Sequence, residues 1–173
     1  WSINSIDGMQ RVVGGYMEHM IASTTTGFTY SGLDKLDPKK NYLFVSNHRD
    51  IAMDPAFVNW ALYSENFKTV RIAIGDNLLS KPYVSDLMRM NKSFIVQRSV
   101  SGMREMMKSL AHLSDYIFTS LQEESNIWIA QKEGRAKDGF DKTEPAIIKM
   151  FYVNGKKQKI SFPDYIKSLN IVP

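Results

Sequence analysis

The chain has 173 residues, of which 43% are hydrophobic and 23% are charged, a balance typical of one globular domain with a hydrophobic core. It contains no cysteine, which excludes disulfides and thiolate metal sites, and only three histidines, so we expect no metal site. The net charge of +4 is compatible with anionic lipid, nucleic acid or phosphate-bearing substrates and does not choose among them.

The first expected element is an amphipathic helix over residues 6–23, where apolar residues such as Met9, Val13 and Met17 recur at helical spacing. We expect it to pack on the domain; the alternative is a membrane-surface helix, but its polar face is not strongly basic. No apolar run in the chain is long enough to span a bilayer, and no signal-peptide pattern is visible.

Short apolar strands alternate with helices along the rest of the chain. The predicted strands are residues 28–30, 42–46, 70–74, 93–96, 126–130 and 171–172. The predicted helices are residues 55–65, 83–90, 101–123, 145–153 and 163–169, with Ser101 as the expected N-cap of the longest. This alternation predicts an α/β fold, a mostly parallel central sheet flanked by helices. We expect a single domain over residues 1–173, with the α/β core in residues 28–173.

Polar clusters follow directly after three of the predicted strands. They are Asn47–Asp50, Arg98–Ser99 and Lys132–Arg135. Because the carboxyl ends of parallel strands meet at one edge of a sheet, and chemistry gathers there, we expect the three clusters to converge on one cleft.

His48 lies at a strand end, a position that suits a general base. Neutral imidazole accepts a proton near pH 7, and a carboxylate on its other nitrogen would fix the tautomer. Asp50 and Asp54 are both close enough in sequence to be that carboxylate, and either could instead cap the following helix.

Four short blocks occur in a fixed order between about residue 28 and the end of the chain. They are Ser46-Asn47-His48-Arg49, Phe94-Ile95-Val96-Gln97-Arg98, Glu133-Gly134-Arg135 and Asn170-Ile171-Val172-Pro173. Together they resemble the glycerolipid acyltransferases, that is, the glycerol-3-phosphate and 1-acylglycerol-3-phosphate O-acyltransferases. The resemblance implies a glycerol-3-phosphate acyltransferase-like α/β fold that is incomplete at its C-terminus. Because the fourth block breaks off at Pro173, we expect the parent protein to continue.

The first block implies the catalytic pair. In the family the His is the base and an Asp after four intervening residues is its partner. His48 matches the His, whereas five residues separate it from Asp54. We favour Asp54, because the apolar Met53 precedes it as in the family, and Asp50 is the alternative.

The second block implies a phosphate site. Arg98 follows an apolar strand, as does the family Arg that binds the phosphate of the acceptor, and its planar guanidinium suits a phosphate. Asn77 belongs to a Gly-x-Asn-Leu stretch similar to the one that precedes this block in glycerol-3-phosphate acyltransferases.

The third block implies further contacts with the acceptor. Glu133 and Gly134 match the family's Glu-Gly pair, which binds the acceptor. Lys132 and Arg135 would add positive charge for its phosphate, or for the phosphates of coenzyme A. The block departs from the family twice: Lys132 stands where many members have Pro, and one small residue is missing between Gly134 and Arg135.

The expected activity is transfer of a fatty acyl group from an acyl thioester to a hydroxyl of glycerol 3-phosphate or a lysophospholipid. The donor would be acyl-coenzyme A or acyl-carrier protein, both substrates, and no cofactor is expected. The thiol is a good leaving group, so no covalent intermediate on the enzyme is required. We expect the protein at the cytoplasmic face of a membrane, peripheral or anchored through parts absent from this chain.

Two alternatives stay open at this point. One is a thioesterase or other hydrolase on the same scaffold, with water as the acceptor. The other is a non-enzymatic module that binds anionic lipid, suggested only by the charge. Nucleic acid is not an expected partner, because the sequence lacks the interleaved aromatic and basic pattern of nucleic-acid readers.

Overall fold

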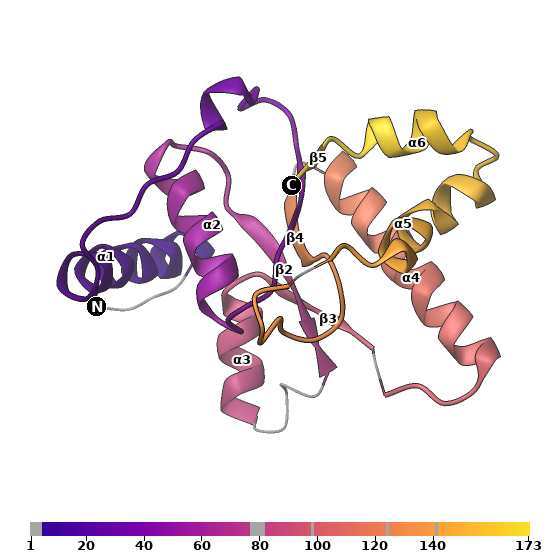
Figure 1. Ribbon diagram of the computed structural model, residues 1–173, viewed down its shortest axis with the longest axis horizontal. Coiled ribbons are helices and arrows are strands. Elements are labelled where there is room, and N and C mark those ends of the chain that lie inside the picture. The colour runs from indigo at the N-terminus through magenta and orange to yellow at the C-terminus, as the bar shows by residue number, and fades with distance from the viewer. Residues whose placement is uncertain (1–4, 77–81, 98, 124, 141) are drawn as a thin grey trace.

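The computed structural model describes residues 5–76, 82–97, 99–123, 125–140 and 142–173. It is an α/β fold in which a five-stranded, all-parallel sheet lies between two layers of helices (Figure 1). The strand order is β3-β2-β4-β1-β5. The strands are β1 Leu43–Ser46, β2 Val70–Gly75, β3 Ser93–Val96, β4 Asn126–Ala130 and β5 Ile171–Val172.

Helices connect these strands and cover the sheet. They are α1 Ile6–Thr24, α2 Met53–Ser64, α3 Pro82–Met90, α4 Met103–Gln122, α5 Pro145–Lys157 and α6 Phe162–Ser168. A short 3-10 turn, Leu33–Lys35, precedes β1. In the part of the chain that the structure describes, no helix is long and apolar enough to cross a bilayer.

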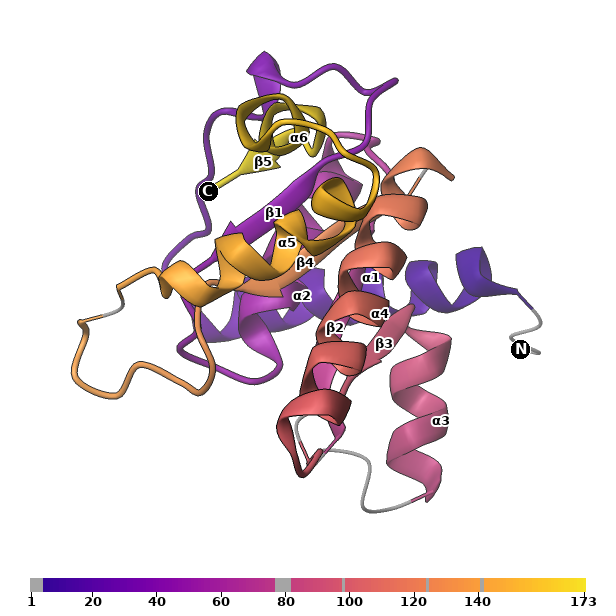
Figure 2. The same ribbon diagram turned by 90° about the vertical axis from the view of Figure 1, so that its right-hand side faces the viewer.

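One face of the sheet packs against α4, α5 and α6, which face the viewer in Figure 2. Leu43 of β1 and Ile127 of β4 are fully buried there. They meet Ile117 of α4, Phe151 of α5 and Tyr165 of α6 in one core. This core joins the last third of the chain to the central strands.

The opposite face packs against α2, with α1 beyond it. Phe44, Ile72 and Trp128 alternate with the residues of the first core along their strands and pack with Leu62 of α2. Burial on both faces explains why these strands read as continuous apolar runs and not as apolar and polar residues in alternation.

The strand predicted at residues 28–30 is wrong. The Phe28 ring stacks on Phe57 of α2, with centroids 5.1 Å apart, and the Tyr30 hydroxyl donates to Glu65, 2.9 Å away. Contacts with the outer side of α2 therefore account for these apolar residues, and the segment joins no strand of the sheet.

Two predicted helix ends also differ from the structure. Ser101 does not cap α4, which begins after Gly102; Gly102 has a φ of 90°, and no side chain caps the helix. The α5 helix continues past residue 153 to Lys157. Gly155 lies inside this last part of the helix. Because it has no side chain, Tyr165 of α6 packs closely against the helix there.

Candidate active site

His48 and Asp54 form a hydrogen-bonded pair at the carboxyl edge of the sheet. His48 follows β1, and its Nδ1 lies 3.0 Å from Oδ2 of Asp54. Both side chains are mostly buried, with exposed fractions of 15% and 18%. Asp54 is in the first turn of α2, where the helix dipole favours a negative charge.

The same Asp54 oxygen also organises the turn between β1 and α2. It accepts the backbone N–H groups of Arg49, at 2.7 Å, and Asp50, at 3.0 Å. The additional residue between His48 and Asp54, compared with the family pattern, is thus absorbed in a turn that closes on the carboxylate.

Asp50 has a different role in this turn. Its Oδ1 accepts the backbone N–H groups of Ala52 and Met53, each at 2.8 Å, at the start of α2. These hydrogen bonds lower the pKa of Asp50, and the positive charge of Arg135 lowers it further. The structure therefore places Asp54 against the His48 ring and Asp50 against the helix start.

The loop after β4 lies beside His48. Lys132, Glu133, Gly134 and Arg135 line the same cavity as His48. Gly134 has a φ of 77°, which glycine adopts without strain. Beyond it, the buried Ala136 donates its backbone N–H to the His48 carbonyl. The Lys132 ammonium lies 3.4 Å from the Phe140 carbonyl oxygen, so it donates across its own loop.

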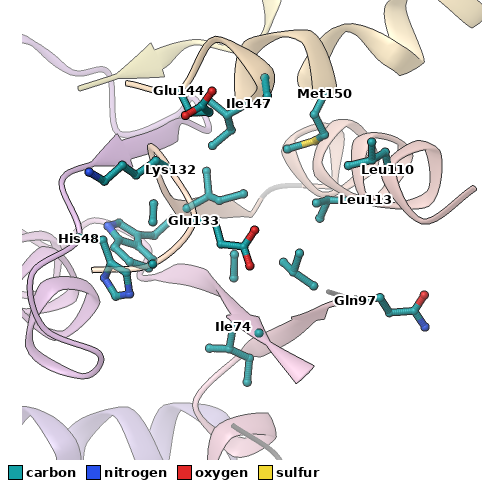
Figure 3. A pocket seen from close by; sticks show the side chains of 18 of the residues that line it. His48, Ile74, Gln97, Leu110, Leu113, Lys132, Glu133, Glu144, Ile147 and Met150 are labelled. Atoms are coloured by element: carbon teal, nitrogen blue, oxygen red, sulfur yellow. The ribbon is translucent and has the colours of Figure 1, made fainter. Parts of the chain in front are cut away.

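The cavity has a volume of about 510 Å³ and is mostly apolar beyond this polar end. Its walls come from β2, β3, β4, α4 and α5. They include Ile72, Ile74, Val96, Leu110, Leu113, Ile129, Ile147 and Met150. Figure 3 shows His48 at one end and Gln97 at the other, with the α4 and α5 side chains along one side. Such a cavity suits a ligand with a long apolar part and a polar reacting group.

Comparison with protein families is in agreement with this geometry. Residues 27–146, more than half of the chain, match the family model described as Acyltransferase. The chain belongs to the acyltransferase family. Comparison with curated proteins finds no match.

Two of the expected binding residues of this acyltransferase, Asn77 and Arg98, lie outside the described residues. Of the three polar clusters expected to converge, those of His48 and Glu133 line one cavity. Gln97, which precedes Arg98 in the sequence, lines the same cavity.

Trp128 is a residue of the acyltransferase site that sequence reasoning assigned only to a buried strand. Its indole Nε1 donates to Oγ of Ser46, 2.9 Å away. Its ring meets His48 edge-on, with centroids 6.0 Å apart. No sequence signal pointed to this contact, because it depends on the parallel register that pairs the end of β1 with the end of β4.

The acyltransferase site contains no cluster suited to a metal ion among the residues that the structure describes. No three His, Asp or Glu side chains come close enough together to bind one there. Among the described groups, the imidazole of His48 can transfer a proton, and the loop after β4 can bind charged groups.

Proposed function

We propose that this acyltransferase moves a fatty acyl group from an acyl thioester to a hydroxyl of glycerol 3-phosphate or a lysophospholipid. The observation that carries the proposal is the His48–Asp54 pair at the polar end of an apolar cavity. A base beside a cavity for a long apolar chain is what hydroxyl acylation requires.

His48 would act as the general base. With Nδ1 bonded to Asp54, Nε2 takes the proton of the acceptor hydroxyl as its oxygen attacks the thioester carbonyl. Asp54 keeps the imidazole in this tautomer and stabilises the imidazolium that forms. When the tetrahedral intermediate collapses, the carbon–sulfur bond breaks and the thiolate takes the proton from His48.

The cavity supports the choice of a fatty acyl donor. Its apolar walls between α4 and α5 would bury the hydrocarbon chain, at about 0.8 kcal/mol for each methylene removed from water. The thioester carbonyl would then lie at the polar end, near His48. Acyl-coenzyme A and acyl-carrier protein both deliver such a chain.

The loop after β4 supports the choice of a phosphate-bearing acceptor. Lys132 and Arg135 bring positive charge to the cavity end that His48 occupies, and Glu133 offers a carboxylate for an acceptor hydroxyl. A lysophospholipid acceptor is amphiphilic, so we propose that the protein works at a membrane surface, on its cytoplasmic side.

The test is an acceptor screen by mass spectrometry with the full-length protein and acyl-coenzyme A of several chain lengths. Glycerol 3-phosphate, lysophospholipids and a simple alcohol such as glycerol serve as acceptors, and acyl-carrier protein replaces coenzyme A in a parallel set. We expect an ester product with a phosphate-bearing acceptor. Release of free fatty acid without any ester product would instead indicate a thioesterase.

A further inference from the structure

A buried glutamine connects the two loops of the site. Gln131 follows β4 and is 8% exposed. Its Nε2 donates to Oδ1 of Asn47, and its Oε1 accepts from Oγ1 of Thr143, both at 2.6 Å. We refer to the contacts Asn47–Gln131–Thr143 as the amide bridge. The amide bridge has no part in the proton transfer by His48 or in the binding by the loop after β4 as described above.

The backbone of Gln131 strengthens the same connection. Its N–H donates to the Ser46 carbonyl, 2.9 Å away, and its carbonyl accepts the Glu144 N–H at 3.1 Å. Side chain and backbone of one residue thus join the end of β1, just before His48, to the last residues of the loop.

The position of the bridge matters for the chemistry. Asn47 precedes His48, and Lys132, the first residue of the acceptor-side loop, follows Gln131. Farther along this loop the buried Ala136 donates its N–H to the His48 carbonyl, 2.7 Å away. The loop is therefore closed at its base by the amide bridge and attached near its middle to His48.

We propose that Gln131 is a positioning residue, and this role depends on the proposed function of the site. The amide bridge holds the loop Lys132–Arg135 at a set distance from His48, and so aligns the acceptor hydroxyl with the base. A displacement of the acceptor of about 1 Å is enough to lower a rate by about 10²-fold. A water molecule can reach His48 without being held by this loop, so loss of the bridge favours hydrolysis over transfer.

Gln131→Met tests this, because methionine has a similar length and lacks both hydrogen-bonding groups. The matched control is Asn154→Leu. Asn154 is 7% exposed and sits in another amide network, with Asp115 and Tyr165, at the far end of α5 from His48. Both variants remove a buried amide, but only the first alters the site.

The measurements use the full-length protein with palmitoyl-coenzyme A and either glycerol 3-phosphate or oleoyl-lysophosphatidic acid. For Gln131→Met we expect kcat/KM for the acceptor to fall at least tenfold, on the scale of such misalignments. The fraction of thioester hydrolysed should rise, and the KM of the donor should stay within about twofold. Asn154→Leu should lower the Tm and leave these kinetic values unchanged.

Thr143→Val provides a second variant if Gln131→Met does not fold, because it removes only the outer contact of the bridge. It should shift the ratio of transfer to hydrolysis in the same direction and by less. Unchanged kinetics in Gln131→Met would overturn the inference about the bridge, and so would an equal loss of kcat/KM in Asn154→Leu. Transfer by the wild type would still support the proposed function in either case. A wild type that transfers no acyl group would overturn both.

Discussion

His48 and Asp54 are six positions apart in the sequence, and the first turn of α2 brings their side chains to 3.0 Å. The Asp54 oxygen that meets the imidazole also accepts two backbone N–H groups of the intervening turn. One carboxylate therefore orients the ring and shapes the loop that carries it, so a change at Asp54 acts on both.

His48→Ala should lower kcat for acyl transfer by about 10²–10⁴-fold, the usual contribution of a general base. Because the side chain lies at the edge of the sheet and not in a core cluster, the Tm should change little. His112→Ala is the control, since His112 is exposed on α4 and should retain full activity. Activity within about tenfold of the wild type would exclude His48 as the base.

Asp54→Asn should lose most of its turnover, by roughly 10²-fold or more, while the KM of the acceptor changes little. The amide cannot stabilise the imidazolium as a carboxylate does. Asp50→Asn should lose little, because an amide oxygen still accepts the N–H groups of Ala52 and Met53. Steady-state kinetics of the two variants decide between them, and the reverse ranking would assign the partner role to Asp50.

Leu110→Trp should make the enzyme select shorter acyl chains. Leu110 lines the cavity from α4, and the larger indole would fill space that the proposal assigns to the hydrocarbon chain. We expect kcat/KM for palmitoyl-coenzyme A to fall by about tenfold or more, and that for butyryl-coenzyme A by much less. Met107→Trp, at an exposed position of the same helix, is the control. An equal loss for both acyl-chain lengths would show that the acyl chain does not bind in this part of the cavity.

Gly155→Ala should destabilise the fold by roughly 1–3 kcal/mol. A Cβ at this position would overlap the Tyr165 ring and lie 2.9 Å from Cδ2 of Tyr152. Gly15→Ala is the matched change in α1, where nothing lies within 4 Å of the new Cβ. It should stabilise the protein by about 0.5–1 kcal/mol, because alanine restricts the unfolded chain and favours helix. Urea unfolding compares the two, and equal effects would contradict the packing described for α5 and α6.

Tyr165 should make the protein sensitive to alkali. Burial raises the pKa of its phenol to about 12, from an ordinary value of 10.0. The unfolded chain therefore loses this proton at a lower pH than the folded chain, so the free energy of unfolding falls between about pH 10 and pH 12. Tyr165→Phe lacks this titration, and its stability should fall less steeply over that range in urea unfolding. Parallel pH profiles would show that the phenol does not contribute.

The order of the helices and strands of the core could be predicted from the sequence because it depends on local periodicity. Apolar runs bounded by turn residues specify strands, and spacing of three to four specifies helices, as in α1 and β4. The alternation then indicates a parallel sheet, and polar residues after its strands indicate the edge where chemistry gathers. This reasoning placed His48 and Glu133 at that edge, and both line one cavity there. The prediction of a strand at residues 28–30 was wrong, because a local apolar pattern does not distinguish packing on a helix from pairing in a sheet.

The tertiary structure decided between Asp54 and Asp50 as the carboxylate that meets His48, and it alone showed where the cavity lies and how its two loops are joined. The resemblance favoured Asp54 and left Asp50 as the alternative, and the turn into α2 directs an Asp54 oxygen to the ring and an Asp50 oxygen to the helix start. Gln131 and Asn47 are 84 positions apart, and their contact exists because β4 pairs in register with β1. Hydrogen bonds of this kind depend on the positions of distant backbone segments, which packing sets and local sequence does not encode.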